Sequence, residues 1–390
     1  MKVICDRAAL QNALNLVAAV APARSPKPEL SCLKLSARKA GAKGAAGGGV
    51  LSFAATDAEV SLRLSRTQVE VHEPGDVLIP ADRIKGVVQA EDAEPTLTLE
   101  TEGDSLQIRG RDAKFRIFGQ PVQNLPPIPE FPDADSAAEV FAINAGTLQR
   151  LITRTIFSVA RDNSRYAING VLMKRDKKKV EMVATDGRRL ALARGTLDNA
   201  ADKGAQCIIP TKALSLVSRL ITDEESTVRI AITANQVLFA FDADDPDTAL
   251  GNVLASNLVE GTFPPYEDVI PKDQDKRAKF DVGVLSSAVR RAALLTTEDS
   301  RGIRMQFAAG DKTVKLTSRT PEMGEAEIDI PFEEYEGGDI EIGFNPAFLS
   351  DALKIVPDQA VLLELKAPNK PGLIRSGSDF MYVVMPVNLH

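Results

Sequence analysis

The hydrophobic and polar positions of residues 165–195 alternate with the two-residue period of β-strands. The recurring apolar positions are Val180, Met182, Ala184, Leu190 and Leu192. The basic residues Lys177–Lys179 precede this alternation, and Asp186-Gly187 interrupts it. The pattern predicts two strands joined by a solvated basic hairpin tip, then a tight turn into a third strand.

A second pattern repeats about every 140 residues and combines a short strand, a small or polar helix-start residue and an amphipathic helix. It is found in KVICDRAALQNALNLVAAVAP from Lys2, VFAINAGTLQRLITRTIFSVARD from Val140 and KFDVGVLSSAVRRAALLTTED from Lys279. Each copy is followed by another strand–turn–helix phrase: GDVLIPADRIKGVVQ, AQCIIPTKALSLVSRL or GDIEIGFNPAFLSDALKIV. These repeats predict a triplicated α+β domain with two helices and several strands in each copy.

Two proline-rich stretches, 120–133 and 261–271, separate the repeats. Proline fits neither a helix interior nor a central strand, so both stretches are expected to be extended connectors. The expected domains are residues 1–124, 136–262 and 272–390. The glycine- and alanine-rich stretch 39–49 is expected to be a flexible hairpin insert. It does not suit a phosphate-binding loop, because the Lys43-Gly44 order is reversed and a strand follows.

Composition removes several function classes. The chain has 390 residues, 44% of them hydrophobic and 26% charged, as in soluble globular proteins. It has no apolar run of about 18 residues, and its charged start does not suit a signal peptide, so a cytoplasmic protein is expected. Three scattered cysteines and two histidines offer neither a disulfide framework nor a histidine-based metal centre. We therefore expect no cofactor, no metal and no catalytic site.

The net charge of −7 argues against an open surface that binds nucleic acid tightly. Basic residues nevertheless recur on the predicted helices. With Asn144 as helix N-cap, the turn angle places Leu148, Ile152, Thr155 and Val159 on one face and Arg150, Arg154 and Arg161 on the other. Other repeats offer Arg24, Arg83, Lys212, Arg219, Arg290 and Arg291. Such residues form either ordinary solvated faces or one shared surface that contacts a polyanion.

The central stretch contains long and specific sequence motifs. It reads R-Y-x-x-N-G-V-L and then V-A-T-D-G-x-R-L-A, and HEPG (72–75), F-P-x-Y (263–266), GFN (343–345) and YVVMP (382–386) stand in matching order. In these motifs the chain resembles the bacterial sliding clamp family, the β subunit of DNA polymerase III. The resemblance implies a clamp fold of three repeated domains, each with two helices packed on antiparallel sheets. It also implies a head-to-tail dimer ring that encloses double-stranded DNA without catalysis.

The resemblance further implies three sets of site residues. A peptide-binding pocket between the second and third domains would comprise Ile168, Thr185, Gly187, Arg188, Arg189, Leu190, Pro264, Val269, Asn345, Phe348, Val383, Val384, Met385, Pro386 and Val387. The DNA-facing residues would be Arg24, Arg83, Arg150, Arg154, Arg161, Tyr166 and Lys212. The dimer interface would use Phe115, Leu294 and Leu295. The implied partners are the polymerase III catalytic subunit, the clamp loader, other polymerases and mismatch-repair proteins, which bind through short linear motifs.

Simpler interpretations stay open at this stage. Residues 383–386 could form a terminal core strand instead of a groove edge, and the dimer residues could be ordinary core. A nucleic-acid enzyme would need carboxylates such as Asp57 and Asp186 to hold metal, although an Asx-turn explains each aspartate without chemistry. An open peptide-binding scaffold without a DNA role is the other alternative.

Overall fold

The computed structural model describes residues 1–39, 48–132, 139–160, 167–197, 204–241, 251–297, 302–321, 323–356 and 358–388. The described residues form six α-helices: α1 (Arg7–Val17), α2 (Ala81–Ala90), α3 (Ala145–Thr153), α4 (Thr211–Leu220), α5 (Val282–Ala292) and α6 (Pro346–Leu353). The chain divides into two compact units. The first unit is Met1–Gly146 with Lys212–Leu258, and the second is Thr147–Thr211 with Val259–His390.

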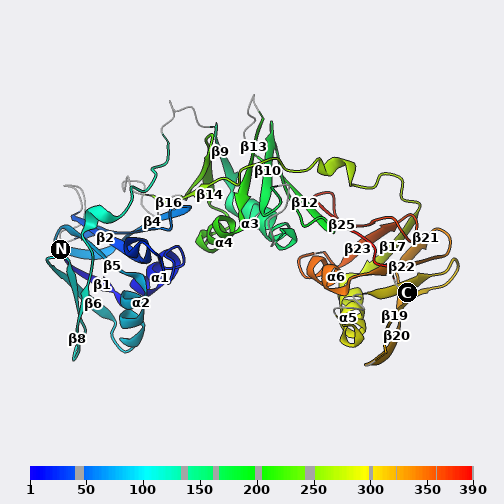
Figure 1. Cartoon of the computed structure of the whole chain (residues 1–390), viewed down its shortest axis with the longest axis horizontal. Coiled ribbons are helices and arrows are strands. Elements are labelled where there is room, and N and C mark those ends of the chain that lie inside the picture. The colour runs from blue at the N-terminus through cyan, green and yellow to red at the C-terminus, as the bar shows by residue number, and fades with distance from the viewer. Residues whose placement is uncertain are drawn as a thin grey trace. The chain divides into compact units, whose positions relative to one another are not determined.

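The first unit contains one antiparallel sheet of twelve strands. Its strands are β1 (Lys2–Asp6), β2 (Cys32–Lys39), β3 (Gly48–Thr56), β4 (Val60–Glu73), β5 (Gly75–Pro80), β6 (Thr96–Glu102), β7 (Ser105–Arg109), β8 (Lys114–Phe118), β9 (Glu139–Asn144), β14 (Thr227–Ile232), β15 (Gln236–Phe241) and β16 (Asn252–Asn257). The main path runs β8-β7-β6-β1-β4-β16-β15-β14-β9, while β2, β3 and β5 branch from β4. Helices α1 and α2 lie together against the N-terminal strands (Figure 1).

The second unit contains a nine-stranded and a four-stranded sheet. Its strands are β10 (Gly170–Asp176), β11 (Lys179–Thr185), β12 (Arg189–Thr196), β13 (Ala205–Pro210), β17 (Lys276–Asp281), β18 (Ile303–Phe307), β19 (Thr313–Thr320), β20 (Gly324–Pro331), β21 (Glu334–Glu336), β22 (Ile340–Phe344), β23 (Ala360–Leu365), β24 (Gly372–Ser376) and β25 (Phe380–Val384). The strand orders are β13-β10-β11-β12-β25-β24-β23-β17-β21 and β20-β19-β18-β22.

The repeated strand–helix phrases fold as the sequence predicts. The pairs β1–α1, β9–α3 and β17–α5 correspond to the first phrase, and β5–α2, β13–α4 and β22–α6 correspond to the second. Capping explains two of the helix starts: the carboxylate of Asp6 accepts the Ala9 N–H at 2.7 Å, and that of Asp281 accepts the Val284 N–H at 2.8 Å. The prediction of an α+β clamp fold with two helices in each repeat is confirmed.

The predicted meander is also present in the described part of 165–195, from Gly170 onward, while residues 165 and 166 lie outside the described residues. Strands β10, β11 and β12 pair in turn, and Lys177, at a φ of 53°, forms the exposed tip of the first hairpin. Gly187 has a φ of 84° in the second turn, where a side chain would strain the backbone. The alternation therefore determines both the strands and their register.

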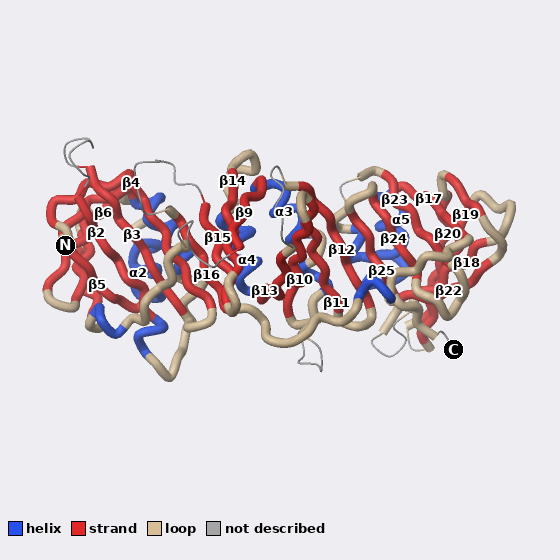
Figure 2. Tube along the Cα trace, turned by 90° about the horizontal axis from the view of Figure 1, so that it is seen from above, coloured by secondary structure: helices blue, strands red, loops and turns tan. Residues whose placement is uncertain are grey.

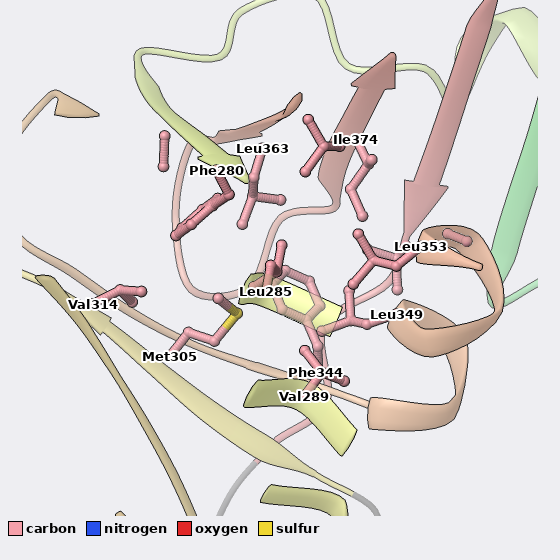
Figure 3. Close-up of a cluster of buried hydrophobic side chains, with 14 of the residues drawn as sticks. Phe280, Leu285, Val289, Met305, Val314, Phe344, Leu349, Leu353, Leu363 and Ile374 are labelled. Atoms are coloured by element: carbon pink, nitrogen blue, oxygen red, sulfur yellow. The ribbon is translucent and has the colours of Figure 1, made fainter. Parts of the chain in front are cut away.

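The C-terminal repeat has a well-packed apolar core (Figure 3). Phe280 from β17, Phe344 from β22 and Leu363 from β23 point toward Leu285 of α5 and Leu349 of α6. All five side chains are buried. The apolar stripes of the two helices are thus covered by the sheets, which fixes α6 next to β25.

Strands from different repeats pair with one another. In the first unit, β4 of the N-terminal repeat pairs with β16 of the central repeat. In the second unit, β12 of the central repeat pairs with β25 of the C-terminal repeat. Figure 2 shows both pairs of neighbouring strands. We call these two pairs the seams, because the main-chain hydrogen bonds of each join one repeat to the next.

The described parts of the connectors contain little regular secondary structure. The described part of 120–133 contains only the 3-10 turn Val122–Asn124 and an isolated bridge at Gln120, and 261–271 contains the 3-10 turn Tyr266–Asp268. Most of the predicted insert at 39–49 lies outside the described residues. In the described part of the chain, no helix is long and apolar enough to cross a membrane.

All three thiols are free and buried. Burial raises the pKa of Cys5 and Cys207 to about 12 and that of Cys32 to about 11; neighbouring carboxylates add to the effect at Cys5 and Cys32. Thiolates are therefore scarce at neutral pH, and these cysteines should be chemically inert.

Candidate functional site

The turn between β11 and β12 organises the predicted peptide-binding residues. The Thr185 hydroxyl donates to the Arg189 carbonyl at 2.7 Å and accepts the Gly187 N–H at 3.1 Å. The Asp186 carboxylate accepts the N–H groups of Arg188 and Arg189, each at 3.0 Å. The turn is thus an Asx-turn that leaves the Arg188 side chain exposed and directs Arg189 inward.

Arg189 lies at the centre of the site and is almost fully enclosed, with 11% of its side chain exposed. Its guanidinium donates to the Asp351 carboxylate at 2.8 Å, to Asp186 at 3.0 Å and to the Phe157 carbonyl at 3.0 Å. Burial acts to lower the pKa of Arg189, but these carboxylates and Tyr382 outweigh that effect and raise it. Arg189 therefore stays charged and fastens three segments of the second unit together.

Aromatic side chains surround this cation. The Arg189 guanidinium lies 4.5 Å from the ring centre of Phe348 and 5.6 Å from that of Phe157. The Tyr382 hydroxyl donates to the Phe348 carbonyl at 2.9 Å. Asn345 caps α6 by accepting the Ala347 N–H at 2.9 Å. Phe348 is consequently held half-buried at the edge of α6.

The connector 261–271 supplies another side of the site. Tyr266 is buried, belongs to the same apolar cluster as Leu190 and Val383, and donates its hydroxyl to Glu181 at 3.2 Å. Anchored in this way, the connector leaves Pro264 half-buried and 48% of Val269 exposed. Ile168, another predicted member, is 9% exposed.

The end of the chain corrects part of the prediction. Val383 and Val384 are 1% and 0% exposed, since β25 is paired on both sides by β12 and β24. The interpretation of these two residues as an exposed groove edge is wrong; they form a core strand. Exposure begins at Met385, at 38%, whose N–H donates to the Arg188 carbonyl at 2.9 Å.

Beyond Met385 the chain stays attached to the C-terminal repeat. Pro386 and Val387 are half-buried, and the Val387 N–H donates to the Gly343 carbonyl at 2.9 Å. The structure thus combines a rigid charged centre with accessible apolar residues: Pro264, Val269, Phe348, Met385, Pro386 and Val387. Apolar anchors of a short peptide require such a surface.

The predicted DNA-facing residues have different environments. Arg24 and Arg83 are exposed, and the Arg83 guanidinium lies 3.7 Å from the Asp82 carboxylate. Arg150 is partly exposed, with 4.0 Å between its guanidinium and Asp379. Arg161 and Tyr166 lie outside the described residues.

The environment of Arg154 corrects the prediction that this residue faces DNA. It is not on an exposed helix face: 6% of its side chain is exposed, and it donates to Asp379 at 2.8 Å. Helix α3 ends at Thr153, and the Thr155 hydroxyl donates back to the Leu151 carbonyl at 2.8 Å. A constant turn angle therefore does not apply beyond Thr153.

Lys212 is also engaged within the protein. Its ammonium pairs with the Asp57 carboxylate and donates to the Val20 carbonyl at 3.1 Å, which joins α4 to the N-terminal repeat. Burial acts to raise the pKa of Asp57, but hydrogen bonds from Lys212 and from the N–H groups of Val60 and Glu59 outweigh it and lower that pKa. We infer that Lys212 positions a helix instead of meeting phosphate with a free ammonium.

Replacement of Lys212 by methionine is expected to lower the free energy of unfolding by about 1–2 kcal/mol at pH 7, between the values for exposed and buried pairs. The folded-state pKa of Asp57 is depressed, so its contribution is present above the ordinary value of 3.8 and lost as pH falls through the folded pKa. Urea unfolding should therefore show the difference shrinking in acid. Arg219→Met, an exposed residue of the same helix, is the control; an equal loss there, or a pH-independent difference, contradicts this role.

The predicted dimer residues lie at the surface. Leu294, in the 3-10 turn Ala293–Leu295 after α5, is 70% exposed, and Leu295 and Phe115 are half-buried. The sequence interpretation missed Phe118, which is 74% exposed at the end of β8. Its signal was present in KFRIF, where a second phenylalanine breaks the strand alternation.

The two aspartates of the enzyme interpretation make structural contacts. The Asp186 carboxylate stabilises its own turn and accepts a hydrogen bond from the Arg189 guanidinium. The Asp57 carboxylate accepts the Glu59 and Val60 N–H groups at 2.9 and 2.6 Å and pairs with Lys212. Among the described residues, no three His, Cys, Asp or Glu side chains gather as metal ligands would. Turn formation and ion pairing account for both carboxylates.

Comparison with known protein families covers nearly the whole chain. The N-terminal, central and C-terminal domains of the DNA polymerase III beta subunit match residues 1–129, 142–265 and 267–388 respectively. The chain belongs to the DNA polymerase III β-subunit family, the β sliding clamps. Members of this family are replication processivity factors and not catalytic subunits, and the family implies DNA and a DNA polymerase as partners.

Individual relatives agree with this assignment. The beta sliding clamp of Pseudomonas putida is 33% identical over 387 residues, which are 98% of this chain and 99% of the relative. The DNA polymerase III subunit beta from Pseudomonas aeruginosa superposes with a TM-score of 0.86 at 31% identity, over 100% of both chains. A DnaN sliding clamp from the same organism, bound to griselimycin, gives 0.88 at 30% identity over 100% of both chains.

Proposed function

We propose that two copies of this β clamp chain join head to tail into a ring that encloses double-stranded DNA in the cytoplasm. The observation that carries the proposal is a pair of sheet ends: β8 and β20 each end a sheet, with exposed Phe118 on β8 and exposed Leu294 beside β19 and β20. An open strand edge with adjacent apolar residues favours pairing with another chain. Family membership supports the same assembly.

Enclosure also accounts for the acidic composition. A ring retains DNA topologically, so it needs only weak contacts that ignore sequence and allow sliding along phosphates. The exposed basic residues on or beside the helices are suited to this: Arg24, Arg83, Arg150, Arg219, Arg290 and Arg291. A net charge of −7 is thus compatible with a DNA partner.

We also propose three domains with the bounds 1–124, 136–262 and 272–390. The repeated phrases and the three family matches support these bounds. The two compact units do not follow them, because the seams β4–β16 and β12–β25 add contacts across the domain boundaries.

Within the ring, the residues around Arg189 would bind short linear motifs of the polymerase III catalytic subunit, the clamp loader, other polymerases and mismatch-repair proteins. The exposed apolar residues Val269 and Met385 support this assignment, since Met385 is bonded to Arg188, next to the Arg189 guanidinium that contacts the ring of Phe348. Methionine adapts to leucine or phenylalanine anchors because its side chain is flexible.

Met385→Glu is expected to weaken binding of a Leu/Phe-containing clamp-binding peptide by about 2–3 kcal/mol, roughly 30- to 150-fold, because a carboxylate would be desolvated against an apolar anchor. Fluorescence anisotropy measures this affinity. Met323→Glu makes the same change at another exposed methionine and should bind normally. Equal affinity of Met385→Glu and the unchanged protein would remove the pocket assignment.

DNA enclosure is tested by loader-dependent retention on circular DNA. We expect the protein to remain on a closed circle after removal of free protein and to leave when the circle is cut. Retention on linear DNA would indicate ordinary binding, and no retention on circles would favour a peptide-binding scaffold. Negative-stain electron microscopy of the free protein should show closed rings.

A further inference from the structure

The outer face of the N-terminal repeat contains a cavity that the clamp function does not use. It has a volume of about 330 Å³ and lies between strands β2–β4 and the connector segment 122–130. This volume is within the range of small-molecule sites. Helices α1 and α2 pack on the N-terminal repeat from the direction of its apolar core, so the cavity is separate from the helix surface.

Strand register explains why this face is polar. Lys34 on β2 lies opposite Ala54 on β3, which in turn lies opposite Arg63 on β4. In the next row Ser36 lies opposite Ser52. The intervening residues are buried in the core: Leu33, Leu35, Phe53, Leu62 and Leu64. The two-residue period therefore places the cations and hydroxyls together, around a small alanine that leaves room.

Direct ion pairs engage two of the three cations that line the cavity. Arg63 lies 3.3 Å from Glu130 and donates to the Ile128 carbonyl at 3.4 Å. Arg38 pairs with Asp76 at 3.0 Å. Lys34, which is half-buried, makes no direct ion pair or side-chain hydrogen bond with any described residue, although the Asp76 carboxylate, already bonded by Arg38 and Ser36, attracts its ammonium. The cavity is therefore lined by three cations, Lys34, Arg38 and Arg63, and one carboxylate, Glu130, and this excess of positive charge in a half-enclosed polar cavity favours an anion.

We propose that this cavity binds a small molecule bearing a phosphate or carboxylate group. The Lys34 ammonium supplies the charge, and the Ser52 hydroxyl, which can accept from Ser65, can donate to a remaining oxygen, whereas Ser36 already donates to Asp76. The segment 122–130 forms the opposite wall, so a bound anion would also contact the start of the connector to the central repeat. Inorganic pyrophosphate serves as the probe for a phosphate ligand, and citrate serves as the probe for a carboxylate ligand.

Calorimetric titration of the full chain at low salt tests the proposal. We expect pyrophosphate or citrate to bind with a Kd below about 1 mM, and the stronger of the two identifies the chemical class. Lys34→Met should weaken that binding at least about tenfold, as expected for losing a charge-assisted hydrogen bond. Lys178→Met removes the same charge at the exposed hairpin tip of β10–β11 and should bind normally.

A second variant tests the cavity itself. Ala54→Leu fills the floor without changing charge, and it should abolish binding while its thermal melting stays close to that of the unchanged protein. The proposal is overturned if neither anion binds, if Lys34→Met binds as well as Lys178→Met, or if Ala54→Leu is folded and binds normally.

Discussion

Replacement of Arg189 by methionine is expected to lower the free energy of unfolding of the second unit by about 3 kcal/mol, the lower end of the cost of removing one partner of a buried ion pair, because the Asp351 and Asp186 side chains are 35% and 20% exposed. The guanidinium contacts three acceptors on three segments, and 11% of its side chain is exposed. Methionine fills similar volume but donates nothing. Asp351, Asp186 and the Phe157 carbonyl would lose their shared donor together.

Urea unfolding followed by circular dichroism gives this difference. Arg188→Met is a close control, because it makes the same change at the adjacent, exposed position and should alter stability by less than about 0.5 kcal/mol. Arg189→Lys should fall between them, since a lysine keeps the charge without the planar fork that reaches several acceptors. Equal stability of the Arg188 and Arg189 variants would show that the cluster does not hold the site together.

Leu294→Asp is expected to weaken the proposed dimer by about a hundredfold or more, because it would bury a charge in the apolar interface between copies. In the free chain Leu294 is 70% exposed, so the monomer should fold normally. Sedimentation at micromolar concentration measures the change. We expect the mass of a dimer for the unchanged chain and of a monomer for the variant.

Val284→Asp provides the comparison, since Val284 is another exposed aliphatic residue and lies in the first turn of α5. An acidic residue is well placed at a helix start, so this variant should remain a folded dimer. Phe118→Asp should behave like Leu294→Asp if β8 meets the other copy. An unchanged mass for Leu294→Asp would exclude this interface.

Local rules were sufficient for most of the fold. The repeated strand–helix phrases carry their own caps, as Asp6 and Asp281 show, and the alternation after Lys179 fixes the β11–β12 register. These features depend on neighbouring residues, so a single sequence contains them. The seams are different, because pairing of β4 with β16 joins residues far apart in the chain, and no local pattern specifies it.

The sequence predicted which residues belong to the site, but it did not predict which of their side chains are buried. Arg189 and Arg188 are adjacent and chemically alike in sequence, yet a contact with Asp351, 162 residues away, buries one of them. Arg154 could not be placed by a turn angle, since the helix ends one residue before it. An apolar run such as Val383–Val384 suits a core strand and a groove edge equally, and only the strands on both sides decide.

The seams have a mechanical consequence for the proposed ring if it opens to admit DNA. Pulling a repeat away from its neighbour would break a row of main-chain hydrogen bonds together, along Val60–Arg63 with Val253–Ser256 or along Arg189–Ala193 with Phe380–Val384. A contact between two copies at β8 and β20 contains no covalent chain and can separate as a whole. Hydrogen–deuterium exchange should therefore remain slow at both seams while the ring opens. The two seams would therefore hold the repeats of each copy together, and the proposed ring would open at the interface between copies.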